Sequence, residues 1–437
     1  MTVTREEQAA EHIHGICLKT GPPGRVGVEL EWLVRDARDP ALPVPAERIA
    51  AAVAAFGAGP GLPSGGSPGV LPRGSLLTTE PGGQLELSSL PADSLAECVR
   101  VTAADVAALR AAAADAGLEL AGVGLDPFRP PRRILRLPRY AAMEAFFDRG
   151  GPWGRQMMCA TASVQVCLDA GDDGGGATGY RWRWRLLHAI GPVLVAAFAN
   201  SPLRGGRPTG WRSSRQQVWA HMDSGRTRPP RLNGRSDGDP RAAWAAYALD
   251  AQVMCVRSEG SDDWSAPPGL TLRDWVRGRA AGGAGRLREP TAEDLTYHLS
   301  TLFPPVRPRG HFELRMIDAQ PGDGWVVPAA VASALLSDER AGEEAMAAAE
   351  PLLARGRAAG DGGDAGGPSE NAWLTAARRG PADPLLARAS RGCFEAARGA
   401  LARQGAPASV RAAVDDFIER YVSKDRCPAD DLLEEAT

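Results

Sequence analysis

Apolar and polar residues alternate along several short stretches of the chain. In VGVELEWLV, residues 26–34, Glu29 and Glu31 are two positions apart and fall on one face of an extended strand, while the apolar residues share the other face. Strand-like patterns are found at 26–34, 82–89, 117–125, 160–169 and 311–318. These stretches predict strands that bury one face in a core and present a polar face opposite.

Helical periodicity separates and follows these strands. It is clearest at 93–116, 179–199, 325–357, 382–404 and 406–424. Because strands and helices are mixed without a regular βαβ rhythm, we expect an α+β fold with a mainly antiparallel sheet and helices packed on one face. The 437 residues would form a single domain, with a strand-rich body at about 20–325 and a helical section at about 326–437.

The polar faces of these strands are unusually acidic. A half-solvated sheet is the simpler explanation for any single strand, but the strands together gather five carboxylates and no lysine. The five are Glu29, Glu31, Glu80, Glu86 and Glu313. Carboxylates on one face repel one another unless cations lie between them. Oxygen ligands without a histidine or thiolate motif suit Mg²⁺ or Mn²⁺, and Mg²⁺ held in this way often shares substrate phosphates. The pattern predicts a site for a nucleotide's phosphates.

Composition excludes several classes of function. The net charge of -3 and a pI near 6.1 give no basic surface for nucleic acid or an anionic membrane. Lysine occurs only at Lys19 and Lys424, so there is no phosphate-binding P-loop, and arginine must meet most anions. Seven scattered cysteines without a CxxC pair indicate a reduced compartment, and no apolar stretch is long enough to span a bilayer. We therefore expect a cytoplasmic protein.

An ordered set of motifs resembles a known family. The segments are VGVELEWLV, EPGGQLELSS, RLPRYAAM, MMCATASVQVCLD, SSRQQVWAHMDSGRT and HFELRMIDAQP. In this order they are similar to the glutamate-cysteine ligases of the plant and proteobacterial type, whose fold is related to glutamine synthetase. Within the family, the ending RYVSKDRCPADD resembles the actinobacterial ligases whose product is used to make ergothioneine.

The resemblance implies a funnel-shaped sheet that binds ATP and Mg²⁺, or Mn²⁺, on its acidic face. The residues that match the family's metal and phosphate ligands are Glu29, Glu31, Glu80, Glu86, Gln165 and Glu313. Those that match its substrate contacts are Arg139, Tyr140, Arg215 and Asp223. Glu29 and Glu31 together with Arg226 and Arg315 would be catalytic. The chain departs from plant sequences at Ala160 and Ala162, where an arginine and a cysteine are expected, so one substrate contact is replaced or absent.

The implied reaction is the ligation of glutamate to cysteine. ATP would phosphorylate the γ-carboxylate of glutamate, and the cysteine amine would displace the phosphate to give γ-glutamylcysteine. Two alternatives stay open: a ligase that joins glutamate to a different amine, and a nucleotide-binding regulator without catalysis. Nothing in the sequence predicts the oligomeric state.

Overall fold

One large sheet lies at the centre of the molecule. The structure is a computed structural model that describes residues 2–57, 68–232, 238–279, 287–358 and 367–436. Its eight-stranded sheet has the order β2-β3-β4-β1-β6-β10-β9, and β5 pairs with β1. The strands are β1 (Val26–Asp36), β2 (Gly69–Val70), β3 (Leu76–Thr79), β4 (Leu85–Ser88), β5 (Leu118–Ala121), β6 (Ser163–Leu168), β9 (Val306–Pro308) and β10 (Phe312–Asp318), while β7 (Leu203–Arg204) and β8 (Arg207–Pro208) form a separate hairpin. The strand pairs are antiparallel, which confirms the predicted α+β class.

The pairing register aligns the polar positions of neighbouring strands. Glu29 lies opposite Gln165 on β6, and Glu31 lies opposite Glu86 on β4. Glu313 on β10 pairs with Cys167 on β6. Since residues directly opposite each other project to the same face, the acids of separate strands collect on one side of the sheet.

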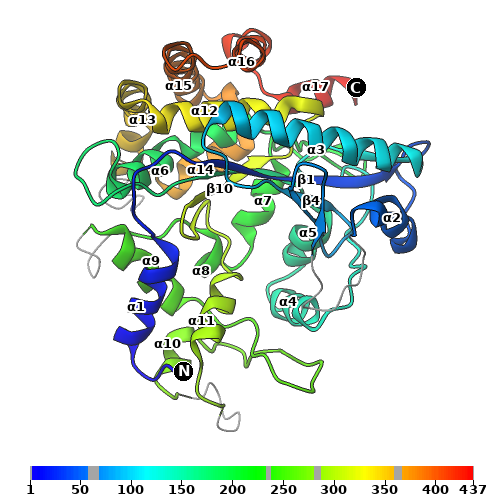
Figure 1. Cartoon of the computed structure of the whole chain (residues 1–437), viewed down its shortest axis with the longest axis vertical. Coiled ribbons are helices and arrows are strands. Elements are labelled where there is room, and N and C mark those ends of the chain that lie inside the picture. The colour runs from blue at the N-terminus through cyan, green and yellow to red at the C-terminus, as the bar shows by residue number, and fades with distance from the viewer. Residues whose placement is uncertain (1, 58–67, 233–237, 280–286, 359–366, 437) are drawn as a thin grey trace.

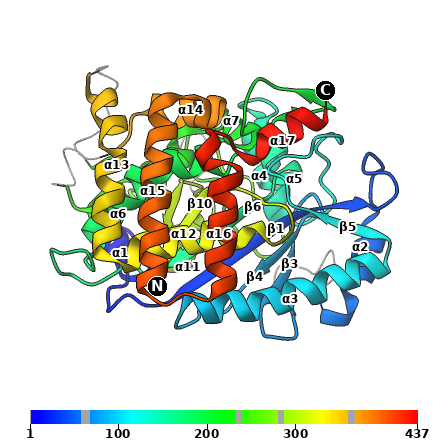
Figure 2. The ribbon, with the colours of Figure 1, turned by 90° about the horizontal axis from the view of Figure 1, so that it is seen from above.

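The opposite face of the sheet is covered by helices. Its apolar residues, among them Val28 and Leu30, form one core with this layer. The helices on this side are α2 (Ala46–Val53), α3 (Leu95–Asp115), α6 (Tyr180–Ala197), α12 (Val326–Ser337), α13 (Glu339–Ala358), α15 (Pro384–Arg403) and α16 (Ala408–Arg420). Helices α3, α12, α13, α15 and α16 lie above the sheet in Figure 1, and α13, α15 and α16 run side by side in Figure 2. α14 (Glu370–Arg379) packs between α6 and α7 (Ser214–His221), and α17 (Pro428–Glu435) is the last helix in the described part of the chain.

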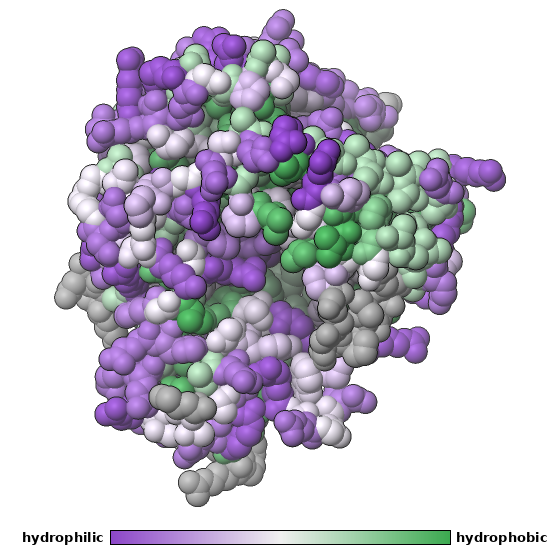
Figure 3. All heavy atoms as spheres, in the orientation of Figure 1, coloured by the Kyte–Doolittle hydropathy of each residue, from purple (hydrophilic) through white to green (hydrophobic). Residues whose placement is uncertain are grey.

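Two smaller groups of helices face the acidic side. One core joins α1 (Glu6–Cys17), α9 (Pro240–Asp250), α10 (Leu272–Val276) and α11 (Ala292–Leu299). Another joins α4 (Pro138–Asp148), α5 (Trp153–Ala160) and α7 (Ser214–His221), with α8 (Ser224–Thr227) following α7. These groups lie below the sheet in Figure 1, and the face shown in Figure 3 is mainly hydrophilic and is hollowed near its middle. The acidic side is thus enclosed without being filled.

One predicted helix is divided. The periodic stretch 325–357 forms α12 and α13, which are separated at Asp338. Asp338 leaves the helical conformation with φ -122° and ψ 112°, and its Oδ1 accepts a hydrogen bond from the Ala341 N–H at 2.9 Å. Alanine-rich sequence on both sides of this cap hides the break from periodicity.

The seven cysteines are all free thiols. Among the described residues, no helix combines the length and apolar character needed to cross a membrane.

Candidate active site

Four glutamates line one cavity of about 350 Å³ on the acidic side of the sheet. Glu29 and Glu31 come from β1, Glu86 comes from β4, and Glu80 precedes the turn into β4. That turn contains Gly83 with φ +91°, a conformation that favours glycine. It returns the chain so that Glu80 and Glu86 reach the same space, which we call the acidic cavity.

The acidic cavity is closed by positively charged and aromatic side chains. Arg139 and Tyr140 extend from α4, Arg215 and Trp219 from α7, and Arg315 from β10. The remaining wall includes Ser300 after α11, Arg307 of β9 and Arg309, which directly follows β9. Carboxylates and guanidinium groups therefore face each other across the cavity.

Burial and mutual repulsion change the protonation of the glutamates. Burial raises the pKa of Glu29 to about 7, with a further increase from the Glu313 charge. Burial and the Glu31 charge raise the pKa of Glu80 to about 7. The pKa of Glu86 is raised well above its usual value by burial and by Glu29 and Glu80. A divalent cation bound among these oxygens would remove the repulsion, so the donor set fits a hard ion such as Mg²⁺.

Glu313 has the opposite electrostatic setting. Although its burial opposes ionisation, Arg307 and Arg315 hold the pKa of this carboxyl well below its usual range. Arg307 donates to both carboxylate oxygens at 2.5 and 3.0 Å, and Arg315 lies 3.2 Å from one of them. Glu313 has no solvent exposure. In the structure its negative charge is therefore neutralised by arginine.

Gln165 links this ion cluster to the glutamates of the acidic cavity. Its Oε1 accepts a hydrogen bond from Arg315, and its Nε2 donates to Glu31 at 3.0 Å. Ser163 also donates to Glu31, at 2.9 Å. The orientation of Glu31 is consequently fixed from β6.

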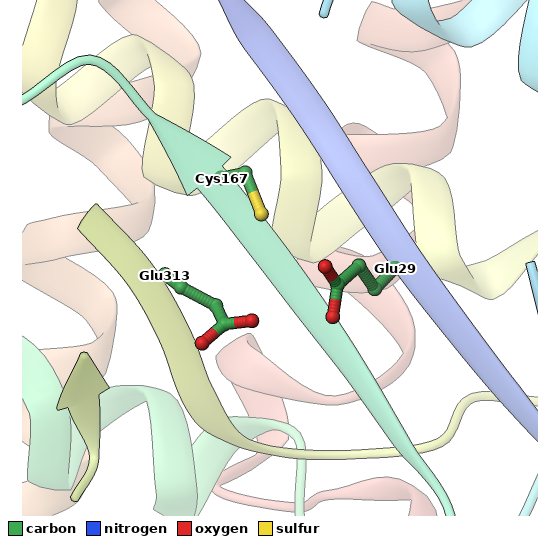
Figure 4. A group of neighbouring side chains, drawn as sticks. All are labelled: Glu29, Cys167 and Glu313. Carbon is green, nitrogen blue, oxygen red and sulfur yellow. The ribbon is translucent and has the colours of Figure 1, made fainter. Parts of the chain in front are cut away.

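Cys167 lies beside Glu29 and Glu313. Figure 4 shows the two carboxylates extending toward each other across β6, with the cysteine sulfur next to them. One ligand atom from each residue lies within 4.8 Å of the others. Burial, together with the charges of Glu29 and Glu313, raises the pKa of the Cys167 thiol well above its usual value. The thiol is therefore held protonated.

Arg215 is placed to receive an anion. Its guanidinium lies 4.4 Å from the centre of the Trp219 ring, and one nitrogen donates to the Arg315 carbonyl at 2.8 Å. Its Nε and Nη1 are buried without a hydrogen-bond partner, as is the Nε of Arg315. Buried donors of this kind need acceptors. A carboxylate or phosphate oxygen in the acidic cavity would supply them.

Arg139 and Tyr140 occupy another side of the cavity. Arg139 donates to the side-chain and backbone oxygens of Ser300 at 3.0 and 3.1 Å, and it stacks on Tyr297 at 5.0 Å. These contacts tie α4 to the end of α11. They fix the position of the neighbouring Tyr140.

The structure places Asp223 and Arg226 outside the acidic cavity. Arg226 is fully buried, donating to the carbonyls of Thr301 at 2.8 Å and Gln252 at 2.5 Å and to Asp223 at 3.0 Å. Asp223 lines a different hollow beside Phe146. This geometry joins α8 to the segment after α11. Arg226 is therefore not placed for the expected catalytic role, nor Asp223 for the expected substrate contact.

Arg307 and Arg309 are wall residues that the sequence patterns did not single out. Arg307 pairs with Glu313, and Arg309 reaches 3.5 Å from Glu313 and 3.9 Å from Glu29. The signal is the segment RPRG that precedes HFELR, because residues two apart in extended backbone share a face. Pro304 and Pro305 before the strand, and Pro308 within it, hide the strand pattern.

Comparison with known proteins places this geometry among ligases. The family described as glutamate-cysteine ligase family 2 matches residues 25–436. The chain is 40% identical over 433 residues to glutamate-cysteine ligase EgtA of Mycobacterium tuberculosis (strain ATCC 25618 / H37Rv), covering 98% of this chain and 90% of that protein. It is 32% identical over 249 residues to the chloroplastic glutamate-cysteine ligase of Medicago truncatula, covering 56% of this chain and 47% of that protein.

Solved structures show a related fold. The glutamate-cysteine ligase of Francisella tularensis in complex with AMP aligns with a TM-score of 0.50 at 12% identity, covering 96% of this chain and 86% of that chain. A bifunctional glutathione synthetase from Pasteurella multocida aligns with a TM-score of 0.51 at 13% identity, covering 98% of this chain and 51% of that chain.

Proposed function

Because the chain belongs to glutamate-cysteine ligase family 2, we propose that it joins the γ-carboxylate of glutamate to the amine of cysteine, using ATP. The products are γ-glutamylcysteine, ADP and phosphate. One observation carries this proposal beyond family membership: four partly buried glutamates and five arginines line the same cavity, and some of the guanidinium donors lack a hydrogen-bond partner. A cavity of this kind suits the transfer of a phosphoryl group to a carboxylate.

Glu29, Glu31, Glu80 and Glu86 are the proposed metal ligands. Bound Mg²⁺ would neutralise the phosphate oxygens and orient the γ-phosphate for transfer. Glu313 and Gln165 were also expected to bind metal. Glu313 accepts a hydrogen bond from Arg307, and Gln165 accepts one from Arg315. We therefore propose that their main role is to orient these arginines toward the cavity.

The arginines have two proposed tasks. Arg315 stabilises the charge that develops when the γ-carboxylate oxygen of glutamate attacks the γ-phosphorus and ADP leaves. Arg215, whose Nε and Nη1 lack hydrogen-bond partners and whose Nη1 lies 3.9 Å from the Asp318 carboxylate, binds a carboxylate of glutamate. Arg139 and Tyr140 shape the amino-acid side of the cavity. The cysteine amine then attacks the γ-glutamyl carbonyl, phosphate departs, and the amine loses a proton.

The nucleotide has a proposed direction along the sheet. The acidic cavity shares Glu29 and Arg309 with a neighbouring space lined by Lys19, Arg25 and His311. We propose that the adenosine lies in this space, which leaves the phosphates beside the glutamates. The amino acids then occupy the opposite end, near Arg139 and Arg215.

We also propose that the chain acts as one catalytic domain in the cytoplasm. Helices α12 to α16 share a continuous core with the sheet, which supports a single folding unit. The EgtA relatives support the expectation that the product enters ergothioneine synthesis.

The first test is ADP release by the purified protein with ATP and Mg²⁺, given glutamate alone, cysteine alone or both. We expect turnover with both, and mass spectrometry should detect γ-glutamylcysteine. Turnover with glutamate and another amine, but never with cysteine, would show that cysteine is not the acceptor substrate. The proposed ATP-dependent ligation of glutamate to an amine would still stand. Nucleotide binding without turnover under any condition would favour the non-catalytic alternative.

A further inference from the structure

A second cavity, separate from the acidic one, has aromatic walls. It measures about 410 Å³ and lies between α6, α7 and α14, beside the segment that follows α8. Three indoles line it, from Trp184, Trp219 and Trp373, together with the ring of His188. We call it the aromatic cavity. The ligation chemistry described above assigns it no task.

Helical spacing shows that the walls of the aromatic cavity are formed by regular faces. Trp184 and His188 are four residues apart on α6, and Gln216 and Ala220 are four apart on α7. α14 contributes residues at 370, 373, 374 and 377, which again form one face. Gly191 makes room for this arrangement, since a Cβ there would lie 2.1 Å from the Trp373 ring. The cavity is thus bounded by three packed helices.

The charge around the aromatic cavity is positive. Arg185, Arg228 and Arg231 line it, and Glu370, the one carboxylate among the lining residues that the structure describes, is paired with Arg228 at 2.6 Å. Within the described part of the chain, neither Arg185 nor Arg231 forms a salt bridge, and both are exposed. His188 adds no charge near neutral pH because burial lowers its pKa to about 4. Two unpaired guanidinium groups therefore stand beside apolar aromatic walls.

We propose that the aromatic cavity is an effector site for a small planar aromatic anion, and that its occupation changes glutamate binding in the acidic cavity. Indole faces and prolines provide surfaces on which a flat ring can stack. Arg185 and Arg231 provide donors for its anionic group. The binding part of this proposal stands independently, whereas the coupling part rests on the proposed ligase function.

α7 supplies the physical connection between the two cavities. The Trp219 indole lines both of them, and Arg215 stacks on that same ring at 4.4 Å. Gln216, on the aromatic side, donates to the Met316 carbonyl of β10 at 2.9 Å, one residue after Arg315. A ligand that moves the Trp219 ring must therefore disturb the stacking contact that positions the Arg215 guanidinium.

The probe for this site is anilinonaphthalene sulfonate, a fluorescent aromatic anion. We expect saturable binding of one molecule per chain in native buffer, with energy transfer from the lining tryptophans. Leu374→Trp, which fills the cavity, should abolish binding. Arg185→Gln combined with Arg231→Gln should weaken binding about 3- to 10-fold, as expected for two partly exposed charge contacts. Arg378→Gln removes a charge from the outer side of α14 and should leave binding unchanged.

The coupling is measured as the KM for glutamate at saturating probe. We expect a change of about 5-fold or more in the unmodified protein and no change in Leu374→Trp. The double arginine variant tests the site even if Leu374→Trp fails to fold. Non-saturable binding, or binding equal in all variants, would overturn the effector site.

Two further outcomes also count against the proposal. Competition between the probe and ATP would make the cavity part of the nucleotide site. Tight binding in the cavity with an unchanged KM would overturn the coupling. If the protein binds the probe but has no ligase activity with any amine, the proposed function fails while the binding site stands.

Discussion

The two faces of β1 differ in what they contribute to the molecule. Val28 and Leu30 are about 1% exposed and join the main core, whereas Glu29 and Glu31 face a cavity with other acids. Burying the apolar side chains stabilises the fold. Gathering carboxylates opposes folding, because burial and neighbouring negative charges raise the pKa values of Glu29, Glu80 and Glu86. Stability and reactivity are therefore separated by one residue along the strand.

The largest effect is expected from Glu29→Gln. This change keeps the side-chain volume and removes a proposed metal ligand, so kcat/KM should fall roughly 100- to 1000-fold. The melting temperature should stay the same or rise, since one repelling charge is lost. Steady-state ADP release and thermal melts measure the two quantities.

The matched control for Glu29→Gln is Glu119→Gln, which removes the same charge from an exposed position on β5. Its activity should equal that of the unmodified protein. If Glu29→Gln were as active as the unmodified protein, Glu29 would not be a metal ligand. The proposed difference in function between the two faces of β1 would then be wrong.

Leu30→Ala tests the other face of the same strand. The substitution leaves a cavity in the core, and we expect a loss of about 2–5 kcal/mol in the free energy of unfolding. The KM for ATP of the folded protein should stay within a factor of about two. Denaturant titration measures the stability, and steady-state kinetics on the same samples measure the KM. A catalytic defect without a loss of stability would contradict the prediction. The control is Leu76→Ala, which truncates a partly exposed leucine on β3.

Arg215 and Arg226 allow a second contrast, between two fully buried arginines. Arg215→Lys should raise the KM for glutamate about 10-fold, because a lysine cannot supply the planar pair of donors. Arg226→Lys should lower the melting temperature and leave the KM unchanged, since its nitrogens donate only to protein groups. An unchanged KM in Arg215→Lys, or a raised one in Arg226→Lys, would reverse the assignments made from hydrogen bonding.

The raised pKa values of Glu29 and Glu80 predict a dependence of stability on pH. Their folded-state pKa values of about 7 exceed the usual unfolded value of about 4.3, so between these limits the folded state binds more protons. Stability of the metal-free protein should accordingly fall as pH rises from about 4.5 through 7. Mg²⁺ should raise the melting temperature more at pH 8 than at pH 6. In Glu29→Gln the pH dependence should be smaller, and equal metal stabilisation at both pH values would contradict the electrostatic account.

The acidic face could be predicted from sequence because its signal is local. Alternation within VGVELEWLV decides the direction of Glu29 and Glu31 whatever the strand pairs with, and antiparallel register then brings Glu86 alongside. The position of Arg226 could not be predicted, because its partners Gln252 and Thr301 are distant in sequence. Local pattern gives the face of a side chain, but contacts between separate elements decide its partners.

The smallest effect is expected from Cys167→Ser, which sharpens the contrast between hard and soft ligands at the site. Mg²⁺ prefers oxygen, and burial beside Glu29 and Glu313 keeps the thiol protonated, so kcat/KM with Mg²⁺ should change by less than about 2-fold.

A thiophilic ion can instead bind the sulfur together with the adjacent carboxylate of Glu29. Cd²⁺ should therefore inhibit the unmodified enzyme at lower concentration than it inhibits Cys167→Ser, and inhibition curves with Cd²⁺ at fixed Mg²⁺ measure this difference. Cys98→Ser, a buried cysteine outside the acidic cavity, is the matched control. Identical curves for the unmodified enzyme and Cys167→Ser would mean that the sulfur does not reach the cation, leaving the oxygens alone to hold it.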